Sequence, residues 1–353
     1  MRPPSEKAPG PGRDGDTMRA ALLAAPGRVA VREVPVPAAG GQALVRVAQA
    51  SLCATDLAIV DGRAPVRTPR ILGHEMTGWV ETPGPSGRVP RGTRVLVNPA
   101  LFCGHCDLCS RDLPQLCRGG GLMGRDADGG FAEFVAADEA RLHPVPASVP
   151  EAEAALLQVL STCVHAQSAV PGSLADTAAV IGLGVTGLLH VQLLRARGVQ
   201  TIVGITRSRR NQDLALRLGA TRVAGPEAAE RVVREATGGR GVDVAVECAG
   251  TAATLAQAMR LAGAGGTVLA FGITAPAADA MPTYEWYYKE LTSFSPRAAR
   301  PRDCELASSL CADRRLDLAP LVTARFPLAR MGDALRAARD PAQLKVVIDV
   351  AHR

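Results

Sequence analysis

The residues with the clearest chemical meaning are four cysteines that lie within fifteen residues of one another. Two, two and seven residues separate them. Thiolates at such short spacings can converge on one tetrahedral zinc ion, and four sulfur atoms fill its coordination. A disulfide pair or a chance cluster is the alternative. We therefore predict a closed, structural zinc site made by Cys103, Cys106, Cys109 and Cys117.

A second chemical pattern is a glycine-rich string that follows a short apolar run and opens an apolar helical stretch. Its first glycine permits a tight turn, its second lets a pyrophosphate approach the backbone, and its third lets helix and strand pack closely. The free amides at the helix start then bind phosphate. Glycine-rich turns also serve packing alone, but between a strand and a helix the string predicts a dinucleotide site. The expected cofactor-binding residues are Gly182, Gly184, Val185, Thr186 and Gly187.

The kind of dinucleotide depends on the end of the second strand of that unit. An NAD site has Asp or Glu about twenty residues after the glycine string, where it binds the ribose 2′-hydroxyl. This sequence has Thr206, Arg207, Ser208 and Arg209 there instead. Hydroxyl and guanidinium groups would bind a 2′-phosphate, although a solvated basic turn is the alternative. We predict NADP(H) over NAD(H).

Two short strings outside the cysteine cluster each join a metal-ligand side chain to a carboxylate. They are Cys53-Ala54-Thr55-Asp56 and Gly73-His74-Glu75. A lone Cys or His is more often a core residue. A catalytic zinc, however, keeps one position open and needs nearby carboxylates and a proton route, which these neighbours offer. The two strings are therefore candidates for a second metal site.

The order of predicted elements indicates how these residues are positioned. A chain of 353 residues is long for one core, so two domains are expected. Residues 1–17 are Pro, Gly and charged residues and are expected to be a disordered extension. Short β-type runs extend from Met18 to about residue 145, and a helical stretch, EAEAALLQVLSTCVHAQSAV, begins at Glu151. From Asp176 strands and helices alternate, which predicts an α/β fold with a doubly wound parallel sheet.

Composition excludes several classes of protein. Hydrophobic residues make up 47% and charged residues 21%, as in ordinary globular proteins. The net charge is +6, but acidic residues are scattered among the basic ones and aromatics are only 3%, so we expect no nucleic-acid partner. No apolar run reaches the length of a membrane span, and no secretory signal is visible. The odd number of cysteines, nine, and their clustering favour a reducing, cytoplasmic location.

In combination, the strings CATD, GHE, C-x2-C-x2-C-x7-C and GLGVTG resemble the zinc-dependent medium-chain alcohol and polyol dehydrogenases. The resemblance runs from about Met18 to Val350. It implies a GroES-like β-rich catalytic domain at 18–160, an inserted Rossmann domain at 161–296, and a return segment at 297–353 that completes the catalytic domain.

The resemblance also implies roles for the residues of the second metal site. Cys53 and His74 would bind a catalytic zinc, and Thr55 would relay the substrate proton. Asp56 would orient the zinc-bound histidine, and Glu75 would lie close to the metal. The four clustered cysteines would hold the second, structural zinc ion of the chain.

Two departures from the family pattern affect the expected chemistry. Gln158 replaces a glutamate that often serves as a further zinc ligand in polyol dehydrogenases. A neutral amide there would leave the zinc site with a net charge of about +1 and a more Lewis-acidic metal. The alternative is that Gln158 only caps a packed helix. Ala58 replaces a histidine that ends the proton relay in many members, so Thr55 would pass its proton to cofactor ribose or water.

The expected reaction is reversible hydride transfer between NADP(H) and a secondary alcohol or ketone, with a sugar, polyol or cyclitol as substrate. Reduction of simple aldehydes or ketones is an alternative, and so is a non-catalytic zinc- and nucleotide-binding scaffold or sensor. We expect a homodimer or homotetramer. The crowded aromatics Tyr284, Trp286, Tyr287 and Tyr288 suit either a substrate cleft or a subunit interface.

Overall fold

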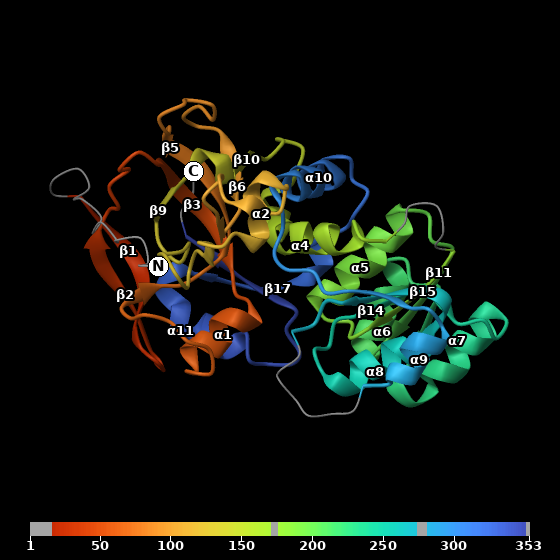
Figure 1. The fold of residues 1–353 in the computed structure, drawn as a ribbon. Helices are drawn as coiled ribbons and strands as arrows, with labels where there is room; N and C mark the ends of the chain where they lie inside the picture. The colour runs from red at the N-terminus through yellow and green to blue at the C-terminus, as the bar shows by residue number, and fades with distance from the viewer. Residues whose placement is uncertain (1–15, 171–175, 274–280, 351–353) are drawn as a thin grey trace. The chain divides into compact units, whose positions relative to one another are not determined.

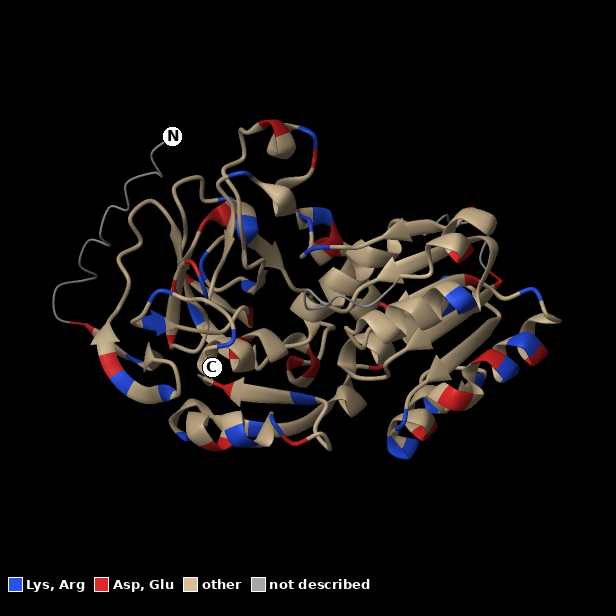
Figure 2. Cartoon of the chain, turned by 60° about the horizontal axis from the view of Figure 1, so that its bottom comes forward, with Lys and Arg blue, Asp and Glu red and all other residues tan. Residues whose placement is uncertain are grey.

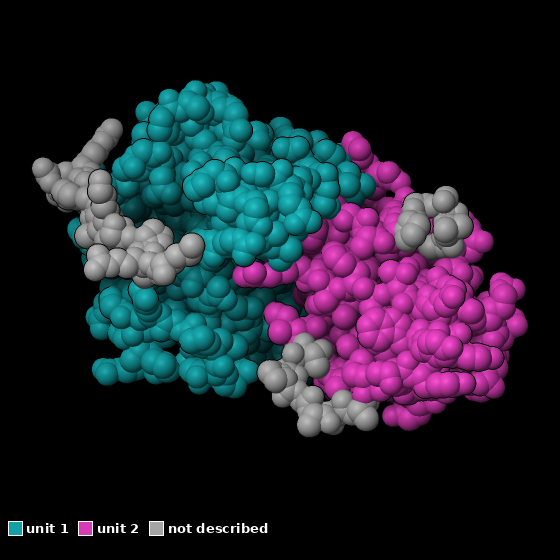
Figure 3. Space-filling view, in the orientation of Figure 1, with its two compact units in different colours: residues 1–158, 300–312, 318–353 teal, residues 159–299, 313–317 magenta. Residues whose placement is uncertain are grey.

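The structure is a computed structural model that describes residues 16–170, 176–273 and 281–350. The chain forms two compact units (Figure 3). Unit 1 contains Met1–Gln158, Arg300–Ala312 and Leu318–Arg353, and unit 2 contains Val159–Ala299 and Asp313–Asp317. The carboxy-terminal residues thus return to the unit in which the chain begins, apart from a short passage through unit 2.

Unit 1 is built on a mixed seven-stranded sheet with two smaller antiparallel sheets (Figure 1). The large sheet has the order β10 (Leu142–Pro144), β6 (Arg94–Val97), β5 (Glu75–Thr82), β3 (Ala43–Ser51), β18 (Lys345–Asp349) and β17 (Val322–Pro327), and β9 (Phe134–Ala137) also pairs with β3. The small sheets are β2 (Arg28–Pro35), β1 (Thr17–Ala25) and β4 (Arg70–Ile71), and β7 (Ala100–Leu101) with β8 (Gly121–Leu122). Its helices are α1 (Ala54–Val60), α2 (Asp107–Ser110), α3 (Glu151–Ala154), α10 (Pro301–Ala312) and α11 (Met331–Ala337).

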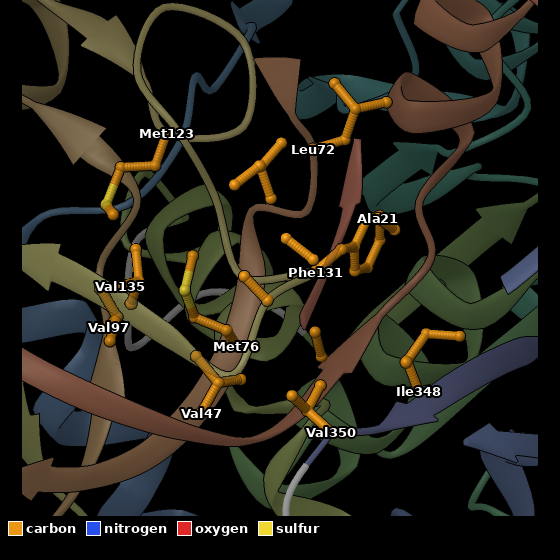
Figure 4. Packing of buried hydrophobic residues seen from close by; sticks show 14 of the residues in the cluster. Ala21, Val47, Leu72, Met76, Val97, Met123, Phe131, Val135, Ile348 and Val350 are labelled. Atoms are coloured by element: carbon orange, nitrogen blue, oxygen red, sulfur yellow. The ribbon is translucent and has the colours of Figure 1, made fainter. Parts of the chain in front are cut away.

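The core of unit 1 joins side chains from both ends of the sequence (Figure 4). Val47, Met76, Val97 and Ile348 come from four neighbouring strands and are fully buried. Each such side chain contributes roughly 1.5–3 kcal/mol to folding by leaving water. Ile348 lies in β18, which pairs antiparallel with β3, so the last strand is a structural part of the first domain.

Unit 2 contains a six-stranded sheet in which every neighbouring pair is parallel. Its strand order is β13 (Arg222–Ala224), β12 (Thr201–Ile205), β11 (Thr177–Ile181), β14 (Val242–Glu247), β15 (Ala262–Ala270) and β16 (Thr292–Phe294). In chain order this is 3-2-1-4-5-6, the arrangement of doubly wound dinucleotide-binding sheets. The α/β, doubly wound prediction is confirmed. The connecting helices are α5 (Val185–Ala196), α6 (Arg209–Arg217), α7 (Ala229–Thr237), α8 (Ala252–Leu261) and α9 (Thr283–Tyr288).

The structure corrects two expectations about element boundaries. The helical stretch from Glu151 is two helices, because α3 ends at Ala154 and α4 (Leu157–Gln167) begins three residues later. Both residues of the break, Ala155 and Leu156, are buried, so tertiary packing overrides their helical propensity. The expected extension 1–17 is one residue too long at least, since Thr17 opens β1 and pairs with Pro35. Residues 1–15 lie outside the described part of the chain.

Charged residues are spread over the surface of each unit. Blue and red segments both occur along the exposed helices (Figure 2). In α7, Arg231 and Glu235 form an ion pair. Among the described residues, no helix is both long and apolar enough to cross a membrane.

Candidate functional site

The amino end of α1 brings two candidate metal ligands together through one carboxylate. Cys53 is the N-cap residue of α1, and its backbone N–H donates to Oδ2 of Asp56 at 2.9 Å. Oδ1 of Asp56 lies 3.3 Å from Nδ1 of His74 and also accepts from the backbone N–H of Gly73 at 3.3 Å. Asp56 is fully buried. The carboxylate therefore fixes the imidazole so that Nε2 remains for a metal ion.

The candidate ligand atoms of Cys53, His74 and Glu75 all lie within 4.8 Å of one another. Burial lowers the pKa of His74, but the charges of Asp56 and Cys53 outweigh this effect and hold the pKa well above its ordinary value. The surroundings thus favour a positive charge on or next to the imidazole. A thiolate, an imidazole and a nearby carboxylate also form a donor set that suits zinc.

Glu75 is held by two residues of which neither was assigned a role at this site from the sequence. Nζ of Lys345 donates to both carboxylate oxygens, at 2.7 and 3.1 Å, and to the carbonyl of Leu52 at 3.3 Å. The Ser51 hydroxyl donates to the same carboxylate. Burial lowers the pKa of Lys345, but the adjacent Glu75 carboxylate raises it above its ordinary value. Glu75 is therefore part of a buried ion pair in this structure.

Three other positions were considered for the catalytic centre, namely Thr55, Gln158 and Ala58. Thr55 lies in the first turn of α1 and is half-buried, directly between Ala54 and Asp56. Gln158 lies in the first turn of α4 and is buried. Its role as a metal ligand stays a prediction. Ala58 lies on α1 and is half-buried, as a methyl group where a relay histidine would stand.

The four clustered cysteines form a separate group with the dimensions of a zinc site. Four of the sulfur–sulfur distances are 3.6, 3.6, 3.8 and 3.9 Å. Sulfur atoms at the corners of a tetrahedron about 2.3 Å from a central zinc would be about 3.8 Å apart. All nine cysteines are free thiols, and a disulfide would need about 2.05 Å. The structure thus brings together Cys103, Cys106, Cys109 and Cys117 without a disulfide.

Electrostatics in this cluster also favour a metal cation. Backbone N–H groups of Arg118 and Cys109 lower the pKa of Cys106 to about 6. Burial, together with the neighbouring Cys106, raises the pKa of Cys109 to about 12. A thiolate at Cys109 is therefore disfavoured unless a positive charge lies among the sulfur atoms, which a zinc ion would supply. His105 is a loop residue whose Nδ1 bonds the carbonyl of Cys103.

The glycine string of unit 2 has the geometry of a dinucleotide loop. Gly182 has a φ of +87°, and a Cβ there would lie 2.8 Å from the backbone nitrogen of Ala249. A Cβ on Gly187 would lie 2.0 Å from the carbonyl oxygen of Gly182, so helix and strand pack at backbone contact. Gly184, by contrast, has open space on its Cβ side. That opening, at the amino end of α5 beside Val185 and Thr186, fits an approaching pyrophosphate.

The residues expected to choose the dinucleotide follow β12. Thr206 is half-buried, whereas Arg207, Ser208 and Arg209 are exposed. Ser208 caps α6, since its hydroxyl accepts from the backbone N–H of Asn211 at 3.4 Å. The Asn211 side chain in turn donates to the carbonyl of Leu183 at 2.9 Å, so α6 is tied to the glycine string.

Comparison with known proteins decides the family. Residues 39–147 match the alcohol dehydrogenase GroES-like domain, and residues 185–313 match the zinc-binding dehydrogenase domain. D-altritol 5-dehydrogenase of Agrobacterium fabrum (strain C58) is 32% identical over 346 residues, which cover 93% of this chain and 98% of that protein. The chain belongs to the zinc-dependent medium-chain dehydrogenase family.

Two further members of this family are similar over almost their whole length. L-threonine 3-dehydrogenase of Bacillus licheniformis is 28% identical over 340 residues, covering 93% of this chain and 98% of that enzyme. A crystal structure of a zinc-binding dehydrogenase from Sinorhizobium meliloti 1021, bound to NADP, has 31% identity and a TM-score of 0.87. It covers 95% of this chain and 99% of that one. The resemblance to the family and the GroES-like plus Rossmann fold are thus confirmed.

As a member of this family, the chain is an alcohol dehydrogenase of the zinc type that uses a nicotinamide cofactor. Sequence reasoning found Cys53, Asp56 and His74, which the structure brings together, but left Lys345 unassigned and missed Ser51. Ser51 gave one signal, because it is a hydroxyl residue at the end of a largely apolar strand, two positions before a candidate ligand.

Proposed function

We propose that this dehydrogenase transfers a hydride between NADP(H) and a secondary alcohol or ketone of a sugar, polyol or cyclitol. One observation carries the catalytic part. The buried carboxylate of Asp56 binds both the backbone of Cys53 and the imidazole of His74. A purely structural role for these residues would not require a thiolate, an imidazole and the further buried carboxylate of Glu75 to lie together.

The roles of the residues follow from this arrangement. Cys53, His74 and Gln158 would hold a catalytic zinc, which when bound supplies a Lewis acid that polarises the substrate oxygen. Asp56 holds His74 through Nδ1 and leaves Nε2 free, so Nε2 would be the atom that binds the metal ion. Glu75 would add negative charge near that ion, and Lys345 would partly neutralise this charge.

Proton and hydride leave the alcohol by different routes. A nicotinamide cofactor, when bound, would accept the hydride from the alcohol carbon, and Thr55 would accept the hydroxyl proton. Because Ala58 has no proton-accepting group, Thr55 would deliver the proton to cofactor ribose or to water. The reverse reaction consumes one hydride and one proton, so charge balances in both directions.

Preference for NADP(H) is supported by the chemistry after β12. No carboxylate stands between Thr206 and Arg210, and hydroxyl and guanidinium donors replace it. Among the described residues Arg207 makes no ion pair, so its guanidinium is available to a 2′-phosphate. The related dehydrogenase from Sinorhizobium meliloti 1021 also binds NADP.

The substrate class is supported by relatives that act on sugar alcohols. The experiment that tests it is NADP⁺ reduction followed at 340 nm with polyols, cyclitols, simple secondary alcohols and L-threonine. We expect kcat/KM for the best polyol or cyclitol to exceed that for 2-propanol by at least a hundredfold. Highest activity on simple alcohols or on L-threonine would overturn the substrate proposal. No turnover of any substrate by protein with full metal would support a scaffold or sensor.

The proposal includes two zinc ions per chain, one at Cys53 and His74 and one at the cysteine cluster. Elemental analysis of protein purified without chelators should give two zinc ions per chain. We also propose a cytoplasmic enzyme that assembles as a homodimer or homotetramer, which light scattering of the purified protein tests. The exposed aromatic residues of α9 are consistent with such a contact.

A further inference from the structure

Glu247 is a buried carboxylate that has no role in the proposed hydride and proton transfer. It is the last residue of β14 and has no exposed surface. One of its oxygens, Oε1, accepts three hydrogen bonds. The donors are the backbone N–H groups of Ala249 and Gly250, both at 2.7 Å, and the hydroxyl of Thr254 at 2.8 Å. Through them, Glu247 fixes the turn between β14 and α8.

The second oxygen of Glu247 is different. Oε2 is buried, and no hydrogen-bond partner for it exists among the described residues. A Cβ added to Gly272 would lie 2.6 Å from Oε2, so any larger residue at position 272 would clash with this oxygen. No Lys, Arg or His of the described chain forms an ion pair with the carboxylate. Buried charges are normally paired and fully hydrogen-bonded, so a buried carboxylate with one oxygen unbonded and no cationic partner requires an explanation.

The position of Glu247 in the sheet supplies that explanation. β14 is the fourth strand in the order 3-2-1-4-5-6 and lies beside β11, with Glu247 opposite Ile181. The next residue, Cys248, donates its N–H to the carbonyl of Ile181 at 2.8 Å. Ala249 then packs against Gly182, the first glycine of the dinucleotide loop. The carboxylate thus lies at the switch point of the sheet, where dinucleotides bind.

The two halves of such a sheet bind the two halves of the dinucleotide. The glycine string after β11 receives the pyrophosphate. The strands on one side of β11, β12 and β13, lie under the adenosine half. The nicotinamide half must then lie over the carboxyl end of β14 and its neighbour β15. Only the oxidised nicotinamide ring carries a positive charge. An unpaired negative charge beneath that half favours the oxidised form over the reduced one.

We propose that Glu247 is a positioning residue of the cofactor site that also favours the oxidised nicotinamide. Its Oε1 holds the turn at 248–250 in place against the glycine string, which both cofactor forms require. Its charge stabilises the oxidised form selectively, so the protein binds the oxidised cofactor more tightly than it would without this charge. This inference rests on the proposed binding of a nicotinamide dinucleotide in unit 2.

The test is isothermal titration of the zinc-loaded protein with NADP⁺ and NADPH, and with NAD⁺ and NADH in parallel. Glu247→Gln keeps an oxygen for the turn but removes the charge. We expect the ratio of Kd for NADP⁺ to Kd for NADPH to rise by roughly threefold to tenfold. Glu235→Gln, which removes a carboxylate from a surface ion pair of α7, is the matched control and should leave the ratio unchanged.

A second variant separates charge from position. Glu247→Asp keeps the charge but withdraws the oxygen from the turn, so both Kd values should rise at least fivefold while their ratio stays within twofold of wild type. An unchanged ratio in Glu247→Gln, or unchanged affinities in Glu247→Asp, would overturn the inference. If Glu247→Gln does not fold, the Asp variant still decides the positioning role of Glu247. Wild-type protein that binds none of the four nucleotides would instead overturn the proposed function.

Discussion

Nζ of Lys345 lies 2.7 Å from Oε2 of Glu75, and both side chains are buried. The two residues are 270 positions apart in the sequence. Since Glu75 follows the candidate ligand His74 directly, this pair sets the charge next to the proposed catalytic metal. It also joins the last strand of the chain to the strand that carries the site.

Lys345→Met removes the cation and leaves the Glu75 carboxylate buried and unpaired. We expect the free energy of unfolding of the zinc-loaded protein to fall by about 3–5 kcal/mol, the usual cost of breaking a buried pair. The double variant Lys345→Met with Glu75→Gln should recover at least half of that loss. Urea unfolding followed by circular dichroism measures both values. Equal losses in the single and double variants would show that the pair itself is unimportant.

Asp56→Asn removes the charge that orients His74. A neutral amide holds the imidazole less firmly and disfavours the nearby cation, so we expect zinc affinity at this site to fall about 10- to 100-fold. Competition with a chromophoric chelator measures it. The control is Asp61→Asn at the exposed end of the same helix, where Asp61 bonds Arg339 and should not affect zinc. Equal zinc affinity in both variants would contradict the assigned role of Asp56.

Cys106→Ser removes one sulfur from the cysteine cluster. We expect zinc content to fall from two ions per chain to one, and limited proteolysis to cut the chain between Cys103 and Cys117 at least tenfold faster. Cys53→Ser should also remove one zinc ion, but leave the proteolysis rate unchanged. Equal rates of cleavage in both variants would mean that metal binding by the cluster does not stabilise the loop between Cys103 and Cys117.

Arg207→Asp places a carboxylate where NAD-binding sheets have one. We expect the ratio of kcat/KM with NADP⁺ to kcat/KM with NAD⁺ to fall by at least a hundredfold. The reason is that the side chain at position 207 would then bind a ribose 2′-hydroxyl and repel a 2′-phosphate. Arg217→Asp, at the far end of α6, is the control and should leave the ratio unchanged. Wild-type preference for NAD⁺, or no shift in Arg207→Asp, would exclude the proposed phosphate site.

His190 makes the stability of unit 2 sensitive to acid. Burial lowers its pKa from 6.5 to about 3, so the unfolded chain binds one more proton than the folded chain between these values. Stability is therefore present in full above about pH 6.5 and is lost as the pH falls. Between pH 6.5 and 5 the loss should be about 2 kcal/mol. Urea unfolding should show this loss in wild type and His105→Leu, but not in His190→Leu.

The sequence predicted the parts of the molecule whose signals are local. The glycine string, the apolar strands around it and the four clustered cysteines each lie within a few tens of residues, so periodicity and spacing reveal them. Short elements gave no such signal. Helix α1 has seven residues and follows a cysteine N-cap. Strand β13 has three residues, of which only Ala224 is buried, and one short pairing. Neither is long enough to show a period.

The contacts around Glu75 could not be predicted from spacing, because they depend on which strands become neighbours. Ser51 and Glu75 face each other only through the register of β3 and β5, and Lys345 arrives only through the pairing of β18 with β3. The break before α4 has a similar origin, since buried packing at Ala155 outweighs local propensity. Gln158 follows that break, and its role as a metal ligand stays a prediction.

The pairing of β18 with β3 also determines when the enzyme can mature during its synthesis. Lys345 leaves the ribosome 293 residues after Leu52, whose carbonyl it binds. At ordinary translation speeds that interval is roughly 15 to 60 s. Until the interval ends, β3 lacks one neighbour and Glu75 lacks its counter-ion, whereas the strands of unit 2 emerge before that point. The nucleotide-binding half can thus fold while the catalytic half is still incomplete, and the site around Glu75 is completed only after the strands of unit 2 are available.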